Sequence, residues 1–250
     1  MPLILGTNSI KDTGYNVANS LRFNSGSSDY LNRTQSSGNR RTFTISTWFK
    51  RSTLGSSQEL LGFAKATNLN MEFKLKSSTD VLRFYSYNGS STTANFTTNR
   101  VFRDVSAWQH FVLSIDTTQS TEANRMKFYV NGVQETSFSA ITYPTLNEDL
   151  QINHGEAIAV GAFPVPPDYF DGYMAEVVLI DGQALDPTSF GEFDSDSPTI
   201  WKPIDVSGLT FGTNGFYLDF EDSSALGNDV SGNNNDFTVN NLTSVDQSTD

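Results

Sequence analysis

The loop with the clearest chemical signature runs from Asp229 to Asp236 and reads Asp-Val-Ser-Gly-Asn-Asn-Asn-Asp. Calcium takes six to eight oxygen ligands from carboxylates, amide carbonyls, the backbone and water. Four side chains supply such oxygens: Asp229, Asn233, Asn235 and Asp236. Gly232 lets the backbone turn tightly around an ion, although its place does not fit the EF-hand pattern. The loop therefore predicts a Ca²⁺ site; the alternative is a turn whose side chains bond their own backbone.

Three aromatic residues outside the predicted strands are candidates for stacking against sugar rings: Tyr169, Trp201 and Tyr143. Sugars need an exposed aromatic face together with polar groups that bond the hydroxyls. Tyr169 follows the stiff segment Pro164-Val-Pro-Pro-Asp168, which cannot be a strand. We expect a glycan contact at these residues, with a loop side chain folded back onto the core as the alternative for each.

The two histidines give little support to an enzyme. His110 shares a strand face with Trp108 and Ser114, which favours a structural role, and His154 has no evident acid or nucleophile partner in the sequence. The sequence contains no serine elbow, no phosphate-binding glycine loop and no histidine-rich zinc pattern.

The elements that position these residues are strands. Residues 111–115 and 126–130 alternate apolar and polar side chains, which is the period of a strand with one buried face. Asn131-Gly132 follows and predicts a type I′ hairpin turn, because both central residues need positive φ. Residues 133–138 are the expected returning strand, so residues 108–138 predict a three-stranded antiparallel meander.

Further strands are expected from the same pattern. In residues 41–50, Phe43, Ile45 and Thr47 take one face, and Thr44, Ser46 and Trp48 take the other. The remaining expected strands are two short ones within 20–31, and 58–63, 71–75, 81–87, 101–105, 157–160 and 173–180. Asp186-Pro187 is the only good helix start, with Asp as cap and Pro at the first helical position. Many short strands at regular spacing predict an all-β, two-sheet antiparallel sandwich.

Composition bounds the class of protein. The chain has 250 residues and 12% aromatic side chains, enough for a sizeable core in one domain. It has no Cys, which excludes disulfides and thiolate metal sites. The N-terminus lacks a signal-peptide pattern, and no run is long enough to span a membrane.

The charge is divided along the chain. Residues 1–127 carry 15 Lys+Arg against 8 Asp+Glu, a balance of +7, whereas residues 128–250 carry 1 against 20, a balance of −19. The overall charge of −12 opposes nucleic-acid binding. Either the two halves interleave and their charges mix, or the molecule has an acidic edge suited to cations or to a neighbour's basic edge.

Six segments in this order resemble the laminin-G-like, concanavalin A-like jelly-roll domains: SLRFNSGSSDYL, FTISTWFKRS, AWQHFVLSIDTT, MKFYVNGVQ, IAVGAF and FDGYMAEVVLIDGQALDPTSF. More narrowly, MPLILGTNSI and YLNRTQSSGNRRTFTISTWFKRS resemble lectin-like structural proteins of marine bacteriophages. The resemblance implies a jelly-roll sandwich whose loops contact glycans or proteins, often with bound calcium. The family pattern would bring Asp171, from a neighbouring loop, to the cation.

Some relatives with this fold are β-glucanases, which carry three acidic residues at alternate positions of one strand. The nearest match here is Tyr217-Leu-Asp219-Phe-Glu221, in which Tyr217 stands where the first carboxylate, the nucleophile, is needed. We therefore expect no catalytic activity.

The C-terminal segment departs from the order that the resemblance implies. Residues 215–222 and 227–237 resemble the segment that normally opens such a domain, yet here they come last. A circularly permuted strand explains this if the termini lie close together; the alternative is the start of a second domain. Permutation is favoured, because a truncated domain would leave Phe216, Leu218 and Phe220 uncovered. We expect one concanavalin A-like sandwich over residues 1–240 and a flexible tail over 241–250.

The resemblances point to a non-catalytic virion structural protein, part of a capsid or tail appendage, that serves particle assembly and host-surface attachment. Its partners would be other virion proteins, further copies of itself and a host cell-surface glycan, with no nucleic acid and no membrane insertion. It would be made in the host cytoplasm and located in the virion. The alternative is a dedicated glycan-binding lectin that recognises host surface polysaccharide.

Overall fold

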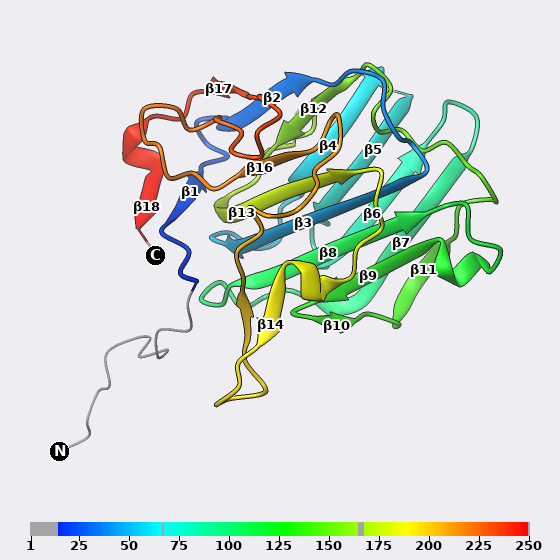
Figure 1. The fold of residues 1–250 in the computed structure, drawn as a ribbon, viewed down its shortest axis with the longest axis horizontal. Helices are drawn as coiled ribbons and strands as arrows, with labels where there is room; N and C mark the ends of the chain where they lie inside the picture. Colours follow the sequence, from blue (N-terminus) through cyan, green and yellow to red (C-terminus); the bar gives the residue numbers. More distant parts are fainter. Residues whose placement is uncertain (1–14, 67, 165–167, 250) are drawn as a thin grey trace.

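The computed structural model describes residues 15–66, 68–164 and 168–249, and these form two antiparallel sheets packed face to face (Figure 1). The first sheet contains β1 (Asn19–Phe23), β3 (Thr42–Arg51), β8 (Gln109–Asp116), β9 (Met126–Val130), β10 (Val133–Gln134), β13 (Gly172–Asp181), β16 (Phe216–Leu218) and β18 (Gln247–Thr249). The second contains β2 (Tyr30–Thr34), β4 (Gln58–Ala66), β5 (Leu69–Leu75), β6 (Val81–Tyr87), β7 (Thr92–Val101), β11 (Phe138–Thr142), β12 (Ala157–Val160) and β17 (Thr238–Asn240).

Helix is confined to three short 3₁₀ turns among these residues: η1 (Glu122–Asn124), η2 (Pro187–Ser189) and η3 (Ser244–Asp246). Asp186 caps η2 as predicted, because its side chain accepts a hydrogen bond from the Thr188 amide. The all-β jelly-roll sandwich predicted from the sequence is confirmed. No helix in the described ranges is both long and apolar enough to cross a membrane.

The core lies between the sheets and follows the predicted alternation. Phe43 and Ile45 of β3 point into the main apolar cluster, whereas Trp48 belongs to a separate cluster with Ala175 and Trp201. Both faces of β3 are buried, because the chain between β13 and β16 packs over the outer face of the first sheet. Within that segment, β14 (Gly191–Phe193) and β15 (Trp201–Pro203) form a hairpin that projects from the sandwich (Figure 1).

The predicted meander is correct in its first two strands. Phe111 pairs with Val130 across β8 and β9, and Asn131 and Gly132 both have positive φ, at 48° and 76°. The returning strand is shorter than predicted: β10 ends at Gln134 and the chain crosses to the second sheet as β11. Glu135 lies at the crossing, where its carboxylate binds Arg100 of β7 at 2.7 Å.

Two other boundaries differ from the sequence prediction. Residues 101–105 do not form a strand beyond Val101, and the real strand is β7 before them, a polar segment in which Ala94 and Phe96 reach the core. The residues predicted as a flexible tail over 241–250 contain η3 and β18 instead. β18 pairs with β1, Leu21 opposite Gln247, because β1 otherwise leaves its outer edge without a partner.

The C-terminal segment belongs to the same sandwich. β16 pairs with β13, Val177 opposite Leu218, and β17 pairs with β2. Phe216, Leu218 and Phe220 lie in the main core cluster. The first and last strands of the described chain lie side by side (Figure 1), which is the arrangement that tolerates a permutation.

Candidate functional site

The outer face of the second sheet carries a set of outward-pointing side chains at the centre of the sheet. Three strands contribute to it in register: Lys74, Arg83 and Thr97; Glu72, Tyr85 and Asn95; Asn70, Tyr87 and Thr92. The residues between them on each strand, such as Phe73, Phe84 and Phe96, point into the core. We call this surface of β5, β6 and β7 the tyrosine face.

Arg83, Tyr85 and Tyr87 form a row along β6. The guanidinium carbon of Arg83 lies 4.1 Å from the centroid of the Tyr85 ring, and the two tyrosine rings are nearly parallel with centroids 6.2 Å apart. Glu72 accepts contacts from Lys74 at 2.9 Å and from Arg83 at 3.2 Å. The row therefore presents half-buried aromatic rings whose cationic neighbours are already paired.

Glu59 lies buried next to this face. It is opposite Lys74 at a register shift of β4, and its carboxylate accepts a hydrogen bond from the Phe73 amide at 2.9 Å. Burial, and then the neighbouring Glu72 carboxylate, raises the pKa of Glu59 well above its usual value. The tyrosine face therefore has little net charge, which suits contact with a neutral molecule.

Tyr169 lies at the border of the same face of the sheet. Its ring centroid is 6.0 Å from that of Tyr30, which points outward from β2. The adjacent Asp168 lies 3.7 Å from the ammonium of Lys74 and accepts a hydrogen bond from Ser57. Tyr169 is half-buried, and of the three predicted sugar-stacking residues it is the one on this face of the sheet; its ring contacts β2, which β4 and β12 separate from the tyrosine face.

Trp201 and Tyr143 are not exposed platforms. Trp201 is 8% exposed and lies in β15, where its indole nitrogen donates to His110 at 2.9 Å. Tyr143 is partly buried and packs against the main core. Both correspond to the alternative of a loop side chain folded back onto the core, because their apolar rings gain more from covering the sandwich than from exposure.

His110 has the structural role expected for it. It is fully buried, hydrogen bonds Ser46 at 2.8 Å, and stacks on Trp48 with ring centroids 4.6 Å apart. Burial lowers its pKa to about 3. Because its Nδ1 accepts from Trp201, the proton of the neutral ring lies on Nε2 and is donated to Ser46.

The loop 229–236 is held together by hydrogen bonds of its own. The carboxylate of Asp229 accepts from the amides of Tyr217, Ser231 and Asn235 and from the Ser231 hydroxyl, at 2.8–2.9 Å. Asp236 accepts from the Asp229 amide at 2.9 Å. These oxygens are already used, so the loop as arranged fits the alternative turn better than a calcium site.

The remaining predicted ligands do not complete a cation site. The side-chain amides of Asn233 and Asn235 donate to backbone carbonyls, and Arg33 donates to the Asn235 carbonyl at 2.5 Å. Asp171 instead accepts from Ser25, at the other end of β13. Since Tyr217 faces Val178, about 20 Å of strand lies between Asp171 and the loop. Within the described ranges no three acidic or histidine side chains are grouped as a metal site.

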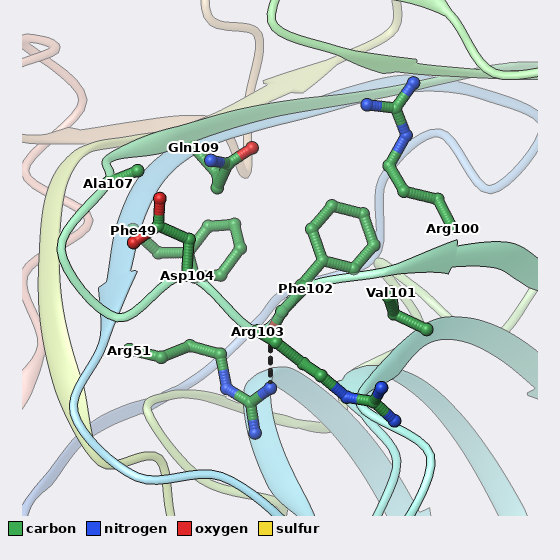
Figure 2. A pocket seen from close by; sticks show the side chains of 9 residues that line it. All are labelled: Phe49, Arg51, Arg100, Val101, Phe102, Arg103, Asp104, Ala107 and Gln109. Carbon is green, nitrogen blue, oxygen red and sulfur yellow. Dashed lines mark hydrogen bonds between the residues drawn. The ribbon is translucent and has the colours of Figure 1, made fainter.

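A hollow of about 200 Å³ lies where β3 and β7 end, with Phe49 and Phe102 at its base and Arg100 and Arg103 at its rim (Figure 2). Arg51 also lines it, and the figure shows its guanidinium bonded to the Phe102 carbonyl. The cations of this hollow have acidic partners nearby, so it is not a strongly charged site.

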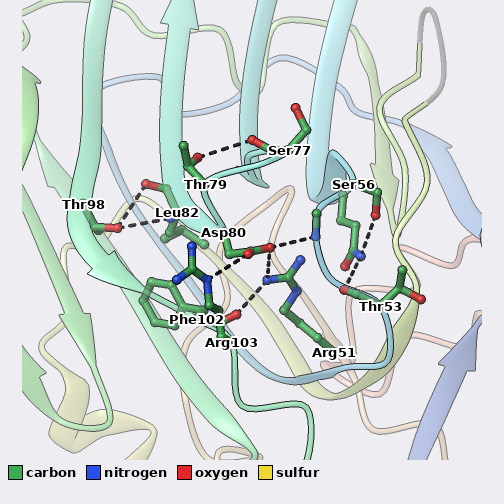
Figure 3. A network of polar contacts seen from close by, with 12 residues as sticks. Arg51, Thr53, Ser56, Ser77, Thr79, Asp80, Leu82, Thr98, Phe102 and Arg103 are labelled. Atoms are coloured by element: carbon green, nitrogen blue, oxygen red, sulfur yellow. Dashed lines mark hydrogen bonds and ion pairs between the residues drawn. The ribbon is translucent and has the colours of Figure 1, made fainter.

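Two of these arginines, Arg51 and Arg103, share a buried acidic partner, Asp80, at the centre of a polar network (Figure 3). The Asp80 carboxylate accepts from Arg51 at 3.0 Å, from Arg103 at 3.1 Å and from the Gly55 amide at 2.9 Å. The Gly55 amide, ahead of the two arginines, lowers the pKa of Asp80. The network joins the segments after β3, β5 and β7, and we assign it to the stability of this end of the sandwich.

The tyrosine face was not identified from the sequence, although two of its three strands, β5 and β6, were predicted. In Val81-Leu-Arg-Phe-Tyr-Ser-Tyr87 the alternation places Arg83, Tyr85 and Tyr87 on one face and Leu82 and Phe84 on the other. That alternation was the available signal: aromatic residues at positions that the period assigns to solvent.

Comparison with known proteins places this geometry in a family. Residues 25–189 match the family model described as the concanavalin A-like lectin/glucanases superfamily. No curated protein matches the sequence.

Solved structures that are similar to the chain have low sequence identity to it. The SAP-like heptameric pentraxin from Limulus polyphemus has 15% identity and a TM-score of 0.48, over 68% of this chain and 78% of the pentraxin. Domains LG4-5 of the mouse laminin α1 chain have 14% identity and a TM-score of 0.46, over 68% and 44%. The CBM40 of the Ruminococcus gnavus IT-sialidase has 14% identity and a TM-score of 0.39, over 54% and 75%. Because the family model covers more than half of the sequence, the chain belongs to the concanavalin A-like lectin/glucanases superfamily.

Proposed function

We propose that the protein is a non-catalytic, lectin-like component of a bacteriophage virion that attaches the particle to surface polysaccharide through the tyrosine face. The observation that carries the binding role is the row formed by Arg83, Tyr85 and Tyr87 along β6. Aromatic rings supply the apolar contact that sugar C–H groups need. Asn95, opposite Tyr85 on β7, flanks the row and offers its side-chain amide N–H group to sugar hydroxyls.

The ligand class follows from charge. Glu72 and Asp168 lie within salt-bridge distance of the cations on or beside this face, so an uncharged glycan meets no unpaired charge there. We propose a neutral polysaccharide segment, lying along the open sheet surface.

A non-catalytic role is supported by the acidic residues after β16. Asp219 accepts a hydrogen bond from the Glu221 amide at 3.1 Å and so closes a local turn. Neither residue belongs to the tyrosine face, and Tyr217 stands where a nucleophile would be needed.

The virion setting is supported by the resemblance of residues 1–10 and 30–52 to phage structural proteins. Under this proposal the protein contacts other virion proteins and further copies of itself. Mass spectrometry of purified virions tests the setting, since the chain must be present in intact particles. Its absence from them would leave a free lectin as the function.

The glycan proposal is tested on an array of bacterial surface polysaccharides, followed by calorimetry with the best binder. We expect Tyr85→Ala and Tyr87→Ala each to weaken binding about tenfold, roughly 1.4 kcal/mol. Tyr173→Ala is the matched control, because Tyr173 lies on the first sheet and stacks under Lys50. Equal effects of all three substitutions, or no binder on the array, would contradict the proposal.

A further inference from the structure

Three hydroxyl and carboxyl oxygens from separate segments meet on the outer face of the first sheet. The Oη atoms of Tyr15 and Tyr217 lie 2.8 Å and 2.7 Å from the same oxygen, Oε2 of Glu176. The two hydroxyls are themselves 2.9 Å apart. Glu176 and Tyr217 are each 5% exposed, so the three oxygens form a closed triangle with little access to water.

The backbone is bent to place Glu176 there. Its φ is +50°, in the left-handed region that a residue with a Cβ rarely occupies. The pairing of β13 with β3 shifts register between Ala175 and Val178, which is a bulge around Glu176. Bulges re-aim a side chain at the expense of regular pairing, and this one directs the carboxyl toward the tyrosines.

Counting protons shows which state of Glu176 the triangle needs. Each tyrosine hydroxyl has one proton to donate, and an ionised carboxylate has none. Two protons cannot supply three oxygen–oxygen contacts, so with ionised Glu176 one contact is a repulsion between lone pairs. A neutral carboxyl adds the third proton and closes the ring, in which each oxygen donates once and accepts once.

The surroundings act in the same direction. Burial, reinforced by Asp219 and Glu221, raises the pKa of Glu176 to about 7 although the two tyrosine hydrogen bonds oppose the shift. Burial and then Glu176 raise the pKa of both tyrosines, and Asp205 faces Tyr15 as well. Among the described residues, the ionisable groups that most influence Glu176 are therefore acidic or phenolic.

Of the three segments, the one with Tyr15 is held least. Glu176 and Tyr217 lie in β13 and β16, whereas strand pairing begins only at Asn19. Two contacts hold residues 15–18 on the sandwich. One is the Tyr15 hydroxyl, and the other is Val17, which packs against the cluster of Trp48, Ala175 and Trp201.

We propose that Glu176, Tyr15 and Tyr217 form a proton-dependent clasp, which holds residues 15–18 on the sandwich at acidic pH and releases them as the pH rises through neutrality. Ionisation removes the third proton and places a negative charge beside Asp219 and Glu221. The segment leaves, Trp48 and its neighbours become accessible, and the sandwich stays folded.

Thiol labelling of the full chain tests the clasp, because the protein has no Cys of its own. Val17→Cys places one thiol on the clasped segment, where it packs against the cluster of Trp48, Ala175 and Trp201, and Val245→Cys, at a position that is 85% exposed, is the reference. Dividing the two labelling rates removes the pH dependence of the thiol itself. We expect the ratio to rise about tenfold between pH 6 and pH 8, since one proton links the clasp to pH over that interval.

Glu176→Gln keeps a neutral side chain at every pH, so in that background we expect a constant ratio. Tyr217→Phe is the second variant: it retains Glu176 and the stacking on Phe211 and removes a hydrogen bond that favours the ionised carboxylate, so the ratio should still rise with pH. A ratio that stays constant in the parent protein, or that rises equally in both variants, would overturn the clasp. Loss of the far-ultraviolet strand signal over the same pH interval would also overturn it, because release must leave the sandwich intact.

Discussion

At the scale of single residues, two of the buried ionisable groups, His110 and Glu176, oppose each other in their effect on stability. The folded pKa of Glu176 is raised, so its contribution is present at acidic pH and is lost as the pH rises through about 7. The folded pKa of His110 is lowered, so its contribution is present above its usual pKa of about 6.5 and is lost as the pH falls. Because the two contributions change in opposite directions, neither can be seen separately in the pH dependence of the unfolding free energy.

A difference measurement isolates His110. At pH 5 the unfolded chain protonates this histidine while the folded chain does not, since the folded pKa is about 3. We expect the stability advantage of the parent over His110→Gln to shrink by roughly 2 kcal/mol between pH 7 and pH 5. Urea unfolding at both pH values measures it, and the Glu176 contribution cancels in the difference. An advantage unchanged by pH would show that His110 becomes protonated within the fold.

Asp229 gives the second test at this scale, because it decides between the predicted calcium site and a turn. Its carboxylate already accepts four hydrogen bonds. We expect equal melting temperatures in millimolar calcium and in EDTA, and an equal loss in both for Asp229→Ala. A melting temperature that calcium raises in the parent and leaves unchanged in Asp229→Ala would instead establish the calcium site predicted from the sequence.

At the scale of elements, the strands whose two faces differ were predictable. Residues 81–87 alternate without interruption and were predicted with the bounds that β6 has. β7 was missed because only Ala94 and Phe96 of its ten residues mark a buried face, so the segment reads as polar. The tyrosine face could not be predicted for a related reason. No sequence motif marks such a surface, and only the register across three strands brings its side chains together.

The position of Trp201 shows a second limit. Its neighbours in sequence do not indicate a strand, and only the fold reveals that β15 lies over Gly132 and His110. A side chain at Gly132 would collide with the indole of Trp201. This glycine therefore makes room for the β14–β15 hairpin and also forms the turn between β9 and β10.

The hairpin of β14 and β15 should depend on this one anchor. Trp201→Ala removes a buried indole and its bond to His110, and we expect a loss of about 3–5 kcal/mol in unfolding free energy. Ile200→Ala is the control within the hairpin segment, because Ile200 is 45% exposed, and it should cost about 1 kcal/mol. Denaturant unfolding measures both. Similar losses for the two substitutions would mean that the hairpin is not anchored through Trp201.

At the scale of the whole molecule, the division of charge along the sequence is partly cancelled by the fold. Both sheets contain strands of both halves: β13 lies between β3 and β1 in the first sheet, and β12 lies between β4 and β2 in the second. Several ion pairs join the two halves directly: Arg41 with Asp149, Lys74 with Asp168, and Arg100 with Glu135. The structure thus favours the interpretation in which the halves interleave, and it leaves fewer unpaired cations for contacts between copies.

The remaining charge still separates the two functional classes. Contacts at an exposed rim weaken as the Debye length falls from about 10 Å at 0.1 M salt to about 3 Å at 1 M. If copies assemble head to tail through charge, we expect the mass measured by light scattering to fall between low and molar salt. Binding of a neutral glycan to the tyrosine face rests on ring contacts and should change by less than about twofold over the same range. A monomer at every salt concentration that binds glycan would reject assembly as the main role. A salt-sensitive oligomer without affinity for any polysaccharide would reject the lectin role, because the two measurements depend on different surfaces of the same sandwich.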